Sequence, residues 1–215
     1  MKNLKLNIQH STPNTQHQHA VHPPNPHFTL IELLVVLGIV IIIFSISLPA
    51  FLTMTKGQSV EIAARTIGSK LNAVRAYAIT HREYTALVFI TDESVSNNRY
   101  NYRAYRPCIV SSSGVFESWV QDEKWEYFPT STALLSLSNS STITSVEDDK
   151  VFGNGITKDL IGVIFKSTGD CLGSRKTVVV GEGVYINNAL KQLNADNTID
   201  ITVDMYTGRV SYGSD

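Results

Sequence analysis

The sequence is short of charge, of cysteine and, in its first 27 residues, of acidic side chains. Charged residues make up 17% of the 215 residues, and the formal net charge is −1. This balance excludes a polycation that coats nucleic acid and also a highly acidic disordered chain. Two cysteines are too few for a disulfide-dense scaffold or a four-cysteine metal site. The length suits one domain with appendages, or two small domains at most.

Catalytic signatures are lacking as well. The sequence contains no serine-nucleophile elbow, zinc-protease helix or dinucleotide-binding fingerprint. The stretch GDCLGSRKT at 169–177 is superficially similar to a phosphate-binding loop, but no lysine directly follows its second glycine. We therefore predict a turn there. The only histidine beyond residue 27 is His81, which makes a catalytic cysteine an unfavourable interpretation. We expect no enzyme, no cofactor and no metal centre.

Residues 1–27 form a leader that carries Lys2, Lys5 and four prolines. No hydrophobic period is sustained in it, so it is predicted to be disordered. Five of the six histidines of the chain lie here: His10, His17, His19, His22 and His27. Such a tract can bind metal, but the irregular spacing and the missing carboxylates favour a polar tail.

Residues 28–52 read FTLIELLVVLGIVIIIFSISLPAFL and carry one charge, Glu32. A helix of this length spans the hydrocarbon core of a bilayer, and it is too long for the apolar core of a cleaved signal peptide. The two leader lysines place the N-terminus in the cytoplasm. A carboxylate in a span costs about 2–3 kcal/mol at the centre, so Glu32 either reaches the headgroups or pairs with a cation from a neighbouring chain.

The stretch FTLIELLVV resembles the processing and assembly motif of type IV pilins and type II secretion pseudopilins. The resemblance implies that a prepilin peptidase cuts between His27 and Phe28, and that the new N-terminus at Phe28 is methylated. It also implies that Glu32 pairs with the N-terminus of an adjacent subunit during filament assembly. Pro49, the 22nd residue counted from Phe28, matches a proline that bends the helix in this family. The chain departs from the family at His27, where glycine is usual.

The same resemblance implies the partners and the location. The partners are the prepilin peptidase, other pilins or pseudopilins, the inner-membrane assembly platform and the lipid bilayer. The chain is expected to cross the bacterial inner membrane once, with its head in the periplasm, and then to enter a pilus or pseudopilus. A subunit of a secretion system and a subunit of a pilus both fit this sequence.

An amphipathic helix over residues 53–82 is predicted to follow the span. Its apolar stripe recurs at steps of three and four residues, and consists of Val60, Ala64, Ile67, Leu71, Val74 and Ala78. The remaining residues, 83–215, favour short β-strands separated by turns. These are expected at 84–91, 100–110, 115–121, 160–166, 177–181, 199–205 and 209–212, with a hairpin turn at Tyr206, Thr207 and Gly208.

A surface loop or insertion is predicted for residues 130–146, because ten of the 17 residues from Thr130 to Val146 are Ser or Thr. The acidic run at Glu147, Asp148 and Asp149 lacks EF-hand spacing, and we expect it to be a solvated loop. The predicted fold class is α+β. A long N-terminal helix, membrane-spanning in its first half and amphipathic in its second, packs on a C-terminal antiparallel β-sheet domain.

The soluble part is similar, more loosely, to the H-type minor pseudopilins, which are grouped with FimT-like minor pilins. The similarity rests on AVRAYAITHREYTALVF, GVIFKSTGD and ITVDMYTGRVSYG. It implies a structural subunit of a filament, processed before Phe28 and assembled through its N-terminal helix. The alternative is a binding module at the tip of such a filament, for DNA uptake or for recognition of a secreted substrate.

Two sets of side chains in the head each have two possible interpretations. Cys108 and Cys171 would lie outside the cytoplasm, where disulfides persist, so they form either a bridge or two separate buried thiols. Arg99, Arg103 and Arg106 alternate with tyrosines, a pattern that can bind phosphate and stack bases. An ordinary strand edge is the favoured interpretation, because strand alternation places Arg103 on the face opposite Arg106. Without the leader, the chain also holds 16 basic and 19 acidic residues.

Overall fold

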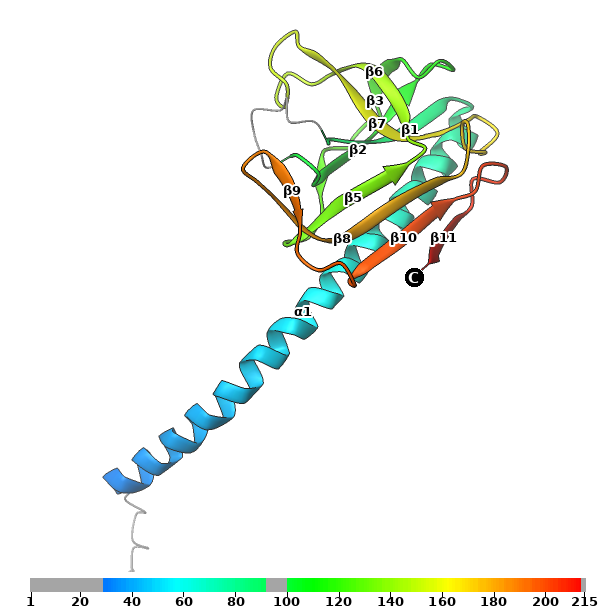
Figure 1. The fold of residues 1–215 in the computed structure, drawn as a ribbon. Helices are drawn as coiled ribbons and strands as arrows, with labels where there is room; N and C mark the ends of the chain where they lie inside the picture. The colour runs from blue at the N-terminus through cyan, green and yellow to red at the C-terminus, as the bar shows by residue number, and fades with distance from the viewer. Residues whose placement is uncertain (1–28, 92–99, 214–215) are drawn as a thin grey trace, which may run out of the picture. The chain divides into compact units, whose positions relative to one another are not determined.

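The structure is a computed structural model that describes residues 29–91 and 100–213, without the side chains of residues 49–57. The chain divides into two units between Ile46 and Ser47. One helix, α1 (Leu30–His81), begins in the first unit and ends in the second, and all strands belong to the second unit, the head (Figure 1). The expected α+β class, with a long N-terminal helix and an antiparallel sheet domain, is confirmed.

Both ends of α1 are capped by local hydrogen bonds. At the start, the backbone N–H of Leu33 donates to the carbonyl of Thr29. At the end, Arg82 adopts a left-handed backbone with φ 58°, and the N–H of Glu83 donates to the carbonyl of Ala78 at 3.2 Å. This is the six-to-one bond of a Schellman cap. The helix therefore ends at His81, one residue before the end expected from the sequence.

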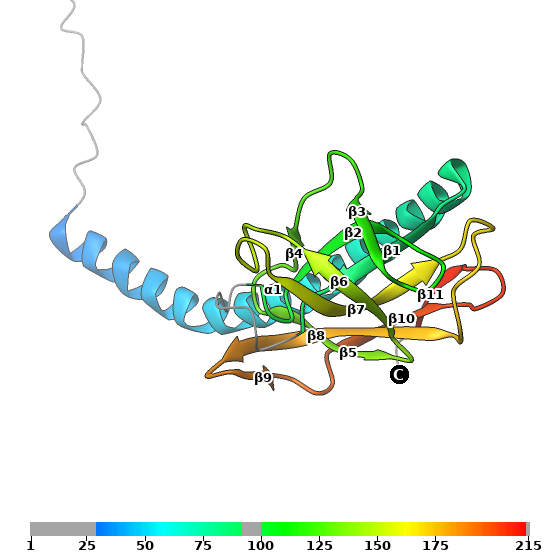
Figure 2. The same ribbon diagram turned by 90° about the horizontal axis from the view of Figure 1, so that it is seen from above.

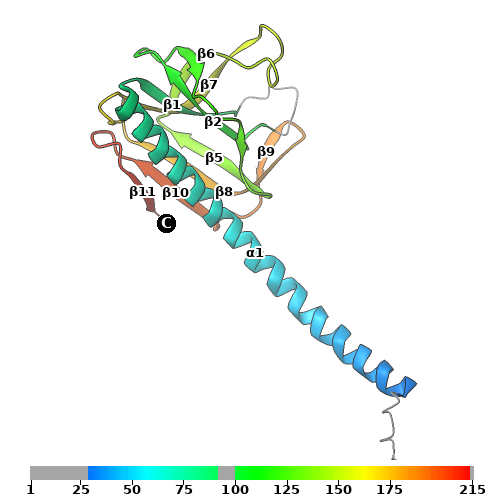
Figure 3. The ribbon, with the colours of Figure 1, turned by 180° about the vertical axis from the view of Figure 1, so that it is seen from behind.

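The apolar stripe of α1 packs in the head as predicted. All six residues of the stripe, from Val60 to Ala78, are at most 3% exposed. Of the charged residues between them, Glu61 and Arg65 form an exposed ion pair, whereas the Lys70 side chain is 16% exposed and pairs with Glu123 and Glu126. At about 25 cal/mol per Å² of apolar surface, burial of this stripe stabilises the docking of the C-terminal half of α1 on the sheets (Figure 3).

The head contains two antiparallel sheets. The first has the order β3-β2-β1-β7-β6, with β4 paired to β2, and the second has the order β11-β10-β8-β5, with β9 paired to β8 (Figure 2). The strands are β1 (Tyr84–Phe89), β2 (Ala104–Val110), β3 (Phe116–Trp119), β4 (Glu126–Tyr127), β5 (Thr132–Ser138), β6 (Ser141–Glu147), β7 (Thr157–Phe165), β8 (Lys176–Ile186), β9 (Ala189–Gln192), β10 (Thr198–Val203) and β11 (Val210–Gly213).

The first sheet has an apolar core on each face. One face joins the second sheet in covering α1, with Leu87, Phe89 and Phe165 in that core. The other face carries a second core that includes Cys108, Ile143 and Ile164. This second core is enclosed because the sheet curls until its outer strands meet, with a bridge between Val115 and Thr144. Alternation along the strands sends successive side chains to opposite cores.

Two sequence-based expectations about the head are wrong. Residues 130–146 are not a surface loop, because most of them form β5 and β6. Their Ser and Thr side chains lie mainly on outer faces, while Leu134, Ile143 and Val146 are buried. The expected strand at 100–110 begins only at Ala104, because residues 100–103 form a turn in which Tyr102 has φ 58°.

Candidate functional site

The first candidate site is the apolar start of α1. Leu30–Leu48 has a mean hydropathy of 2.9 and is long and apolar enough to cross a membrane. Its side chains are exposed, with Leu30 at 83% and Ile46 at 72%. Each large apolar side chain left in water forgoes about 1.5–3 kcal/mol of burial free energy. This surface is therefore suited to lipid or to apolar faces of other chains.

Glu32, the single charge of this span, lies in the first turn of α1. Its Oε2 accepts hydrogen bonds from the N–H and the hydroxyl of Thr29, both at 3.4 Å, and the N–H of Glu32 donates to Oγ1 of Thr29 at 3.3 Å. This reciprocal pair is a capping box, which satisfies two of the free N–H groups at a helix start. The positive end of the helix dipole also stabilises the carboxylate.

The other predicted residues of the motif are only partly described. His27 and Phe28 lie outside the described residues, so the processing site stays a prediction. Pro49 lies inside α1, which continues through it as a helix. The assembly roles of Glu32 and Pro49 also stay predictions.

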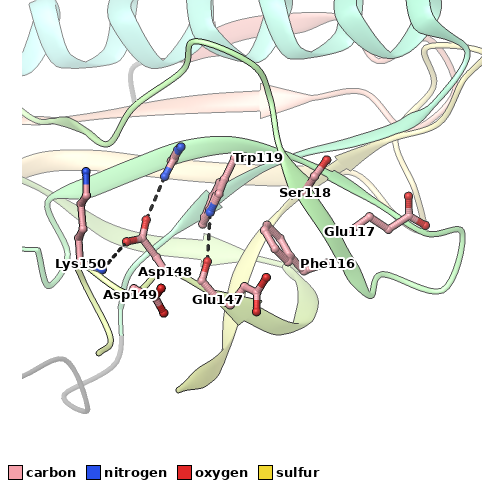
Figure 4. Close-up of a pocket in the computed structure, with 9 residues that line it drawn as sticks. Phe116, Glu117, Ser118, Trp119, Glu147, Asp148, Asp149 and Lys150 are labelled. Carbon is pink, nitrogen blue, oxygen red and sulfur yellow. Dashed lines mark hydrogen bonds and ion pairs between the residues drawn. The ribbon is translucent and has the colours of Figure 1, made fainter. Parts of the chain in front are cut away.

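The second candidate site is a pocket on the head, with a volume of about 510 Å³. Its side chains come from β2, β3 and the end of β6 with the turn that follows (Figure 4). The aromatic wall is Phe116 and Trp119, whose ring centroids are 4.9 Å apart. The polar lining is Arg106, Glu117, Ser118, Glu147, Asp148, Asp149 and Lys150.

Asp148 organises this pocket. Its Oδ2 accepts from Nη1 of Arg106 and from Nε1 of Trp125, both at 2.9 Å, and its Oδ1 accepts from the N–H groups of Lys150 and Val151 at 3.0 and 3.2 Å. The guanidinium of Arg106 also lies 4.1 Å from the ring centroid of Trp119, a cation–π contact. Partial burial lowers the pKa of Arg106, and the charge of Asp148 opposes this shift.

The expected solvated loop at 147–149 is therefore only half correct. Glu147 and Asp149 are exposed, whereas the Asp148 side chain is 10% exposed and paired with Arg106. Because Arg106 and Asp148 neutralise each other, three exposed carboxylates and one amine remain around the pocket. The pocket consequently favours cationic over anionic ligands.

The described residues of the arginine–tyrosine pattern favour the ordinary strand edge over a surface for nucleic acid. Arg99 lies outside the described residues. Arg106 is neutralised by Asp148, and Tyr105 is 2% exposed and donates to Glu126. Arg103 lies in the turn before β2, where its Nη2 donates to the carbonyl of Phe128 at 3.4 Å. The described part of the pattern thus has a buried ring and a paired charge, so it offers little to bases or phosphates.

The two cysteines are free and buried, which is the second of the two alternatives left open by the sequence. Strand register gives the reason. Ala86 on β1 lies between Cys108 and Ile164, and all three face the second core. Cys171 pairs with Phe165, the next residue along β7, and faces the core beneath α1. The sheet separates the two thiols. Burial raises the pKa of Cys108 to about 12 and that of Cys171 to about 11.

Over residues 29–91 and 100–213, no group of three or more His, Cys, Asp or Glu side chains is arranged to hold a metal ion. Sequence reasoning missed Trp119, which lines the pocket, and Trp125, which holds the pocket residue Asp148. Their indole N–H groups donate to the carbonyl of Glu147 and to Asp148, respectively. The only available signal was the closeness of two tryptophans to an acidic run, and it gives no distance in space.

Comparison with known proteins adds similarities of structure. No protein-family model matches the sequence, and no curated protein matches it. The chain is similar to the type IV minor pilin FimU of Pseudomonas aeruginosa, with 10% identity, a TM-score of 0.45, and coverage of 74% of this chain and 92% of that one. It is also similar to the minor pseudopilin EpsH from the Type 2 Secretion System of Vibrio cholerae, with 11% identity, a TM-score of 0.44, and coverage of 73% and 97%. These values are too low to assign a family.

Proposed function

We propose that this chain is a structural subunit of a pilin-like filament, either a type II secretion pseudopilus or a type IV pilus. One observation carries the proposal: the exposed apolar start of α1 contains a single charge, Glu32, fixed in the first helical turn. Fifteen or more exposed apolar side chains would be unfavourable in water. A bilayer covers them before assembly, and neighbouring helices cover them in a filament.

The charge of Glu32 fixes how the apolar helices of neighbouring chains align with one another. Oε1 of Glu32 accepts no hydrogen bond from the described residues, since the capping box uses Oε2 alone. After cleavage before Phe28, the new α-amine of a neighbouring chain pairs with this oxygen inside the lipid or the filament core. A charge pair is strengthened in such a low-dielectric setting. The inner-membrane platform and the prepilin peptidase are the partners that this route requires.

Processing is the first step to test. The chain is expressed in a host with its own prepilin peptidase, and its intact mass and N-terminal sequence are measured. We expect a chain that starts at methylated Phe28 in spite of the unusual His27. A chain that still starts at Met1 would contradict the filament role, because Glu32 would then lack its cationic partner. A His27→Gly variant is the control, since it restores the usual residue before the cut.

The second candidate function is a binding module at the filament tip. The pocket around Trp119 favours it, because an aromatic wall with exposed carboxylates suits a cationic group on a protein partner. The DNA version is tested by mixing the full chain in non-ionic detergent with labelled DNA at low salt. We expect no mobility shift. A shift that Arg103→Gln or Arg106→Gln abolishes would restore the nucleic-acid interpretation.

A further inference from the structure

The connection between β6 and β7 carries the only Asn-Gly pair of the sequence, Asn154–Gly155. In such a pair, the backbone nitrogen of the glycine can attack the side-chain carbonyl carbon of the asparagine, because a glycine has no Cβ to obstruct the approach. The two reacting groups belong to neighbouring residues, so the covalent chain keeps them within reach of each other. The surrounding turn decides how freely they react.

Two features of this turn permit the reaction. Asn154 and Gly155 are both exposed, and the Asn154 carboxamide forms no hydrogen bond with the described residues. Gly155 has φ +70°, and apart from its chain neighbours no heavy atom lies within 4 Å of the place that a Cβ would take. Gly153, on the other side of Asn154, has φ +100°. Because glycines give the backbone freedom on both sides, the Asn154 side chain can turn toward the nitrogen of Gly155.

A third feature restrains the reaction. Oδ1 of Asp149, which lies in the same turn (Figure 4), accepts a hydrogen bond from the N–H of Gly155 at 3.3 Å. This N–H must lose its proton before the nitrogen attacks. A carboxylate beside it stabilises the protonated nitrogen and repels the negative charge that develops. The hydrogen bond is longer than the usual value of about 2.9–3.0 Å, so we expect it to slow the attack without preventing it.

We propose that Asn154 is a site of spontaneous deamidation and that Asp149 restrains its rate. The nitrogen of Gly155 loses its proton to solvent and forms a bond to Cγ of Asn154. The bond from Cγ to the side-chain nitrogen breaks, and ammonia leaves with a proton taken from water. Water then opens the succinimide ring, at one carbonyl to give aspartate and at the other to give isoaspartate. Water is thus the only co-reactant.

The product carries a new negative charge in the turn beside the pocket of Trp119. Asp149 lines this pocket and lies within hydrogen-bond distance of Gly155. A carboxylate at position 154 repels that of Asp149, and the isoaspartate form also adds one carbon to the main chain. We therefore expect the product to lose the hydrogen bond between Asp149 and Gly155. This inference goes beyond the proposed filament function and does not depend on it.

The test follows residue 154 in the full chain, kept in non-ionic detergent at neutral pH and physiological temperature. Trypsin cuts after Lys150 and Lys158, so the peptide VFGNGITK reports on Asn154 alone. Mass spectrometry measures the replacement of the carboxamide by a carboxylate, and labelling by an isoaspartate methyltransferase identifies the isoaspartate product. Digestion in ¹⁸O-water marks any deamidation that occurs during the digestion. The synthetic peptide VFGNGITK, which lacks Asp149, gives the unrestrained rate.

We expect the full chain to deamidate at Asn154 several-fold more slowly than the peptide, and Asp149→Ala to deamidate several-fold faster than the wild type. Glu147→Ala, which removes another exposed carboxylate of the same acidic run, keeps the wild-type rate. Gly155→Ala is slower than the wild type, because its Cβ obstructs the attack. If neither the wild type nor Asp149→Ala converts in the time that the peptide takes to convert completely, the proposal is overturned. Equal rates in Asp149→Ala and Glu147→Ala would also overturn it.

Discussion

Thr29 and Glu32 form a reciprocal capping box at the start of α1, in which each side chain accepts the backbone N–H of the other. The residue that the sequence marks for filament assembly therefore also stabilises the first turn of its own helix. An alanine at position 32 removes both contributions at once. Experiments on this motif need variants that separate the cap from the charge.

The cap alone is tested at Thr29. We expect Thr29→Ala to destabilise the first turn of α1 by about 1 kcal/mol, because an N-cap hydroxyl is lost. Thr29→Ser keeps a hydroxyl and serves as the control. Amide hydrogen exchange of residues 30–33 in detergent micelles measures the difference. Equal exchange in the two variants would show that the capping box does not stabilise this turn.

Asp148 is predicted to stabilise the head, in contrast to its neighbour in the sequence. Asp148→Asn leaves the partly buried Arg106 without its counter-charge, and we expect a loss of about 1–3 kcal/mol in the free energy of unfolding. Asp149→Asn is the matched control, because Asp149 is exposed and such a change stays within about 0.5 kcal/mol. Urea unfolding followed by tryptophan fluorescence measures both. Similar stabilities for the two variants would contradict the role of Asp148.

Gly208 in the β10–β11 turn is predicted to be irreplaceable for two reasons. Its φ is +62°, and a Cβ there would overlap the carbonyl oxygen of Gly169, which already accepts from Nε of Arg75 at 2.9 Å. Gly155 has φ +70° with open space around it. We expect Gly155→Ala to cost about 1 kcal/mol, the conformational term alone, and Gly208→Ala to cost clearly more. Thermal unfolding of the two variants is the measurement, and equal losses would mean that the turn yields to the added methyl group.

Stability is predicted to fall at alkaline pH. Burial raises the pKa of Tyr105, and Glu126 adds to the rise. Partial burial lowers the pKa of Lys70, but its bonds to Glu126 and Glu123 outweigh this, so the pKa of Lys70 lies above its usual value. A group whose pKa is raised by folding stabilises the protein below its unfolded pKa, and this contribution is lost as the pH rises further.

The contribution of Tyr105 and Lys70 to the unfolding free energy is therefore expected to stay constant up to about pH 10 and to fall above it. The pKa values in the unfolded chain are about 10 for tyrosine and about 10.4 for lysine. Tyr105→Phe removes the tyrosine contribution and flattens part of the fall. Unfolding curves between pH 8 and about 11.5 test this. An identical alkaline fall in Tyr105→Phe would exclude Tyr105 as a cause.

Much of the fold follows from local pattern. The stripe from Val60 to Ala78 has the period of one helical face, and β1 is a short run of aromatic, β-branched and other apolar residues, as in a strand that is buried on both faces. The segment 130–146 was mistaken because Ser and Thr are common in loops, whereas threonine also suits a half-exposed strand. The pairing of β5 with β8 and of β6 with β7 is a long-range choice, decided by packing that the segment's own residues do not reveal.

Less of the candidate site than of the fold could be predicted from the sequence. An apolar span with a glutamate four residues after Phe28 is a contiguous motif and can be recognised by spacing. The contact of Arg106 with Asp148, by contrast, joins residues 42 positions apart. Strand alternation also predicted that Arg103 and Arg106 lie on opposite faces of one strand. This prediction does not apply, because residues 100–103 form a turn and Arg103 is not in the strand.

The measurement that tests the filament role most directly is the incorporation of Glu32→Gln into sheared filaments. Glutamine keeps the capping box and removes the charge, so the variant separates the two roles of Glu32. In the native host we expect normal amounts in the membrane fraction and at least a tenfold loss from the filament fraction, with Thr29→Ala close to wild type. Wild-type incorporation of Glu32→Gln would contradict charge pairing and leave Glu32 as a helix cap alone.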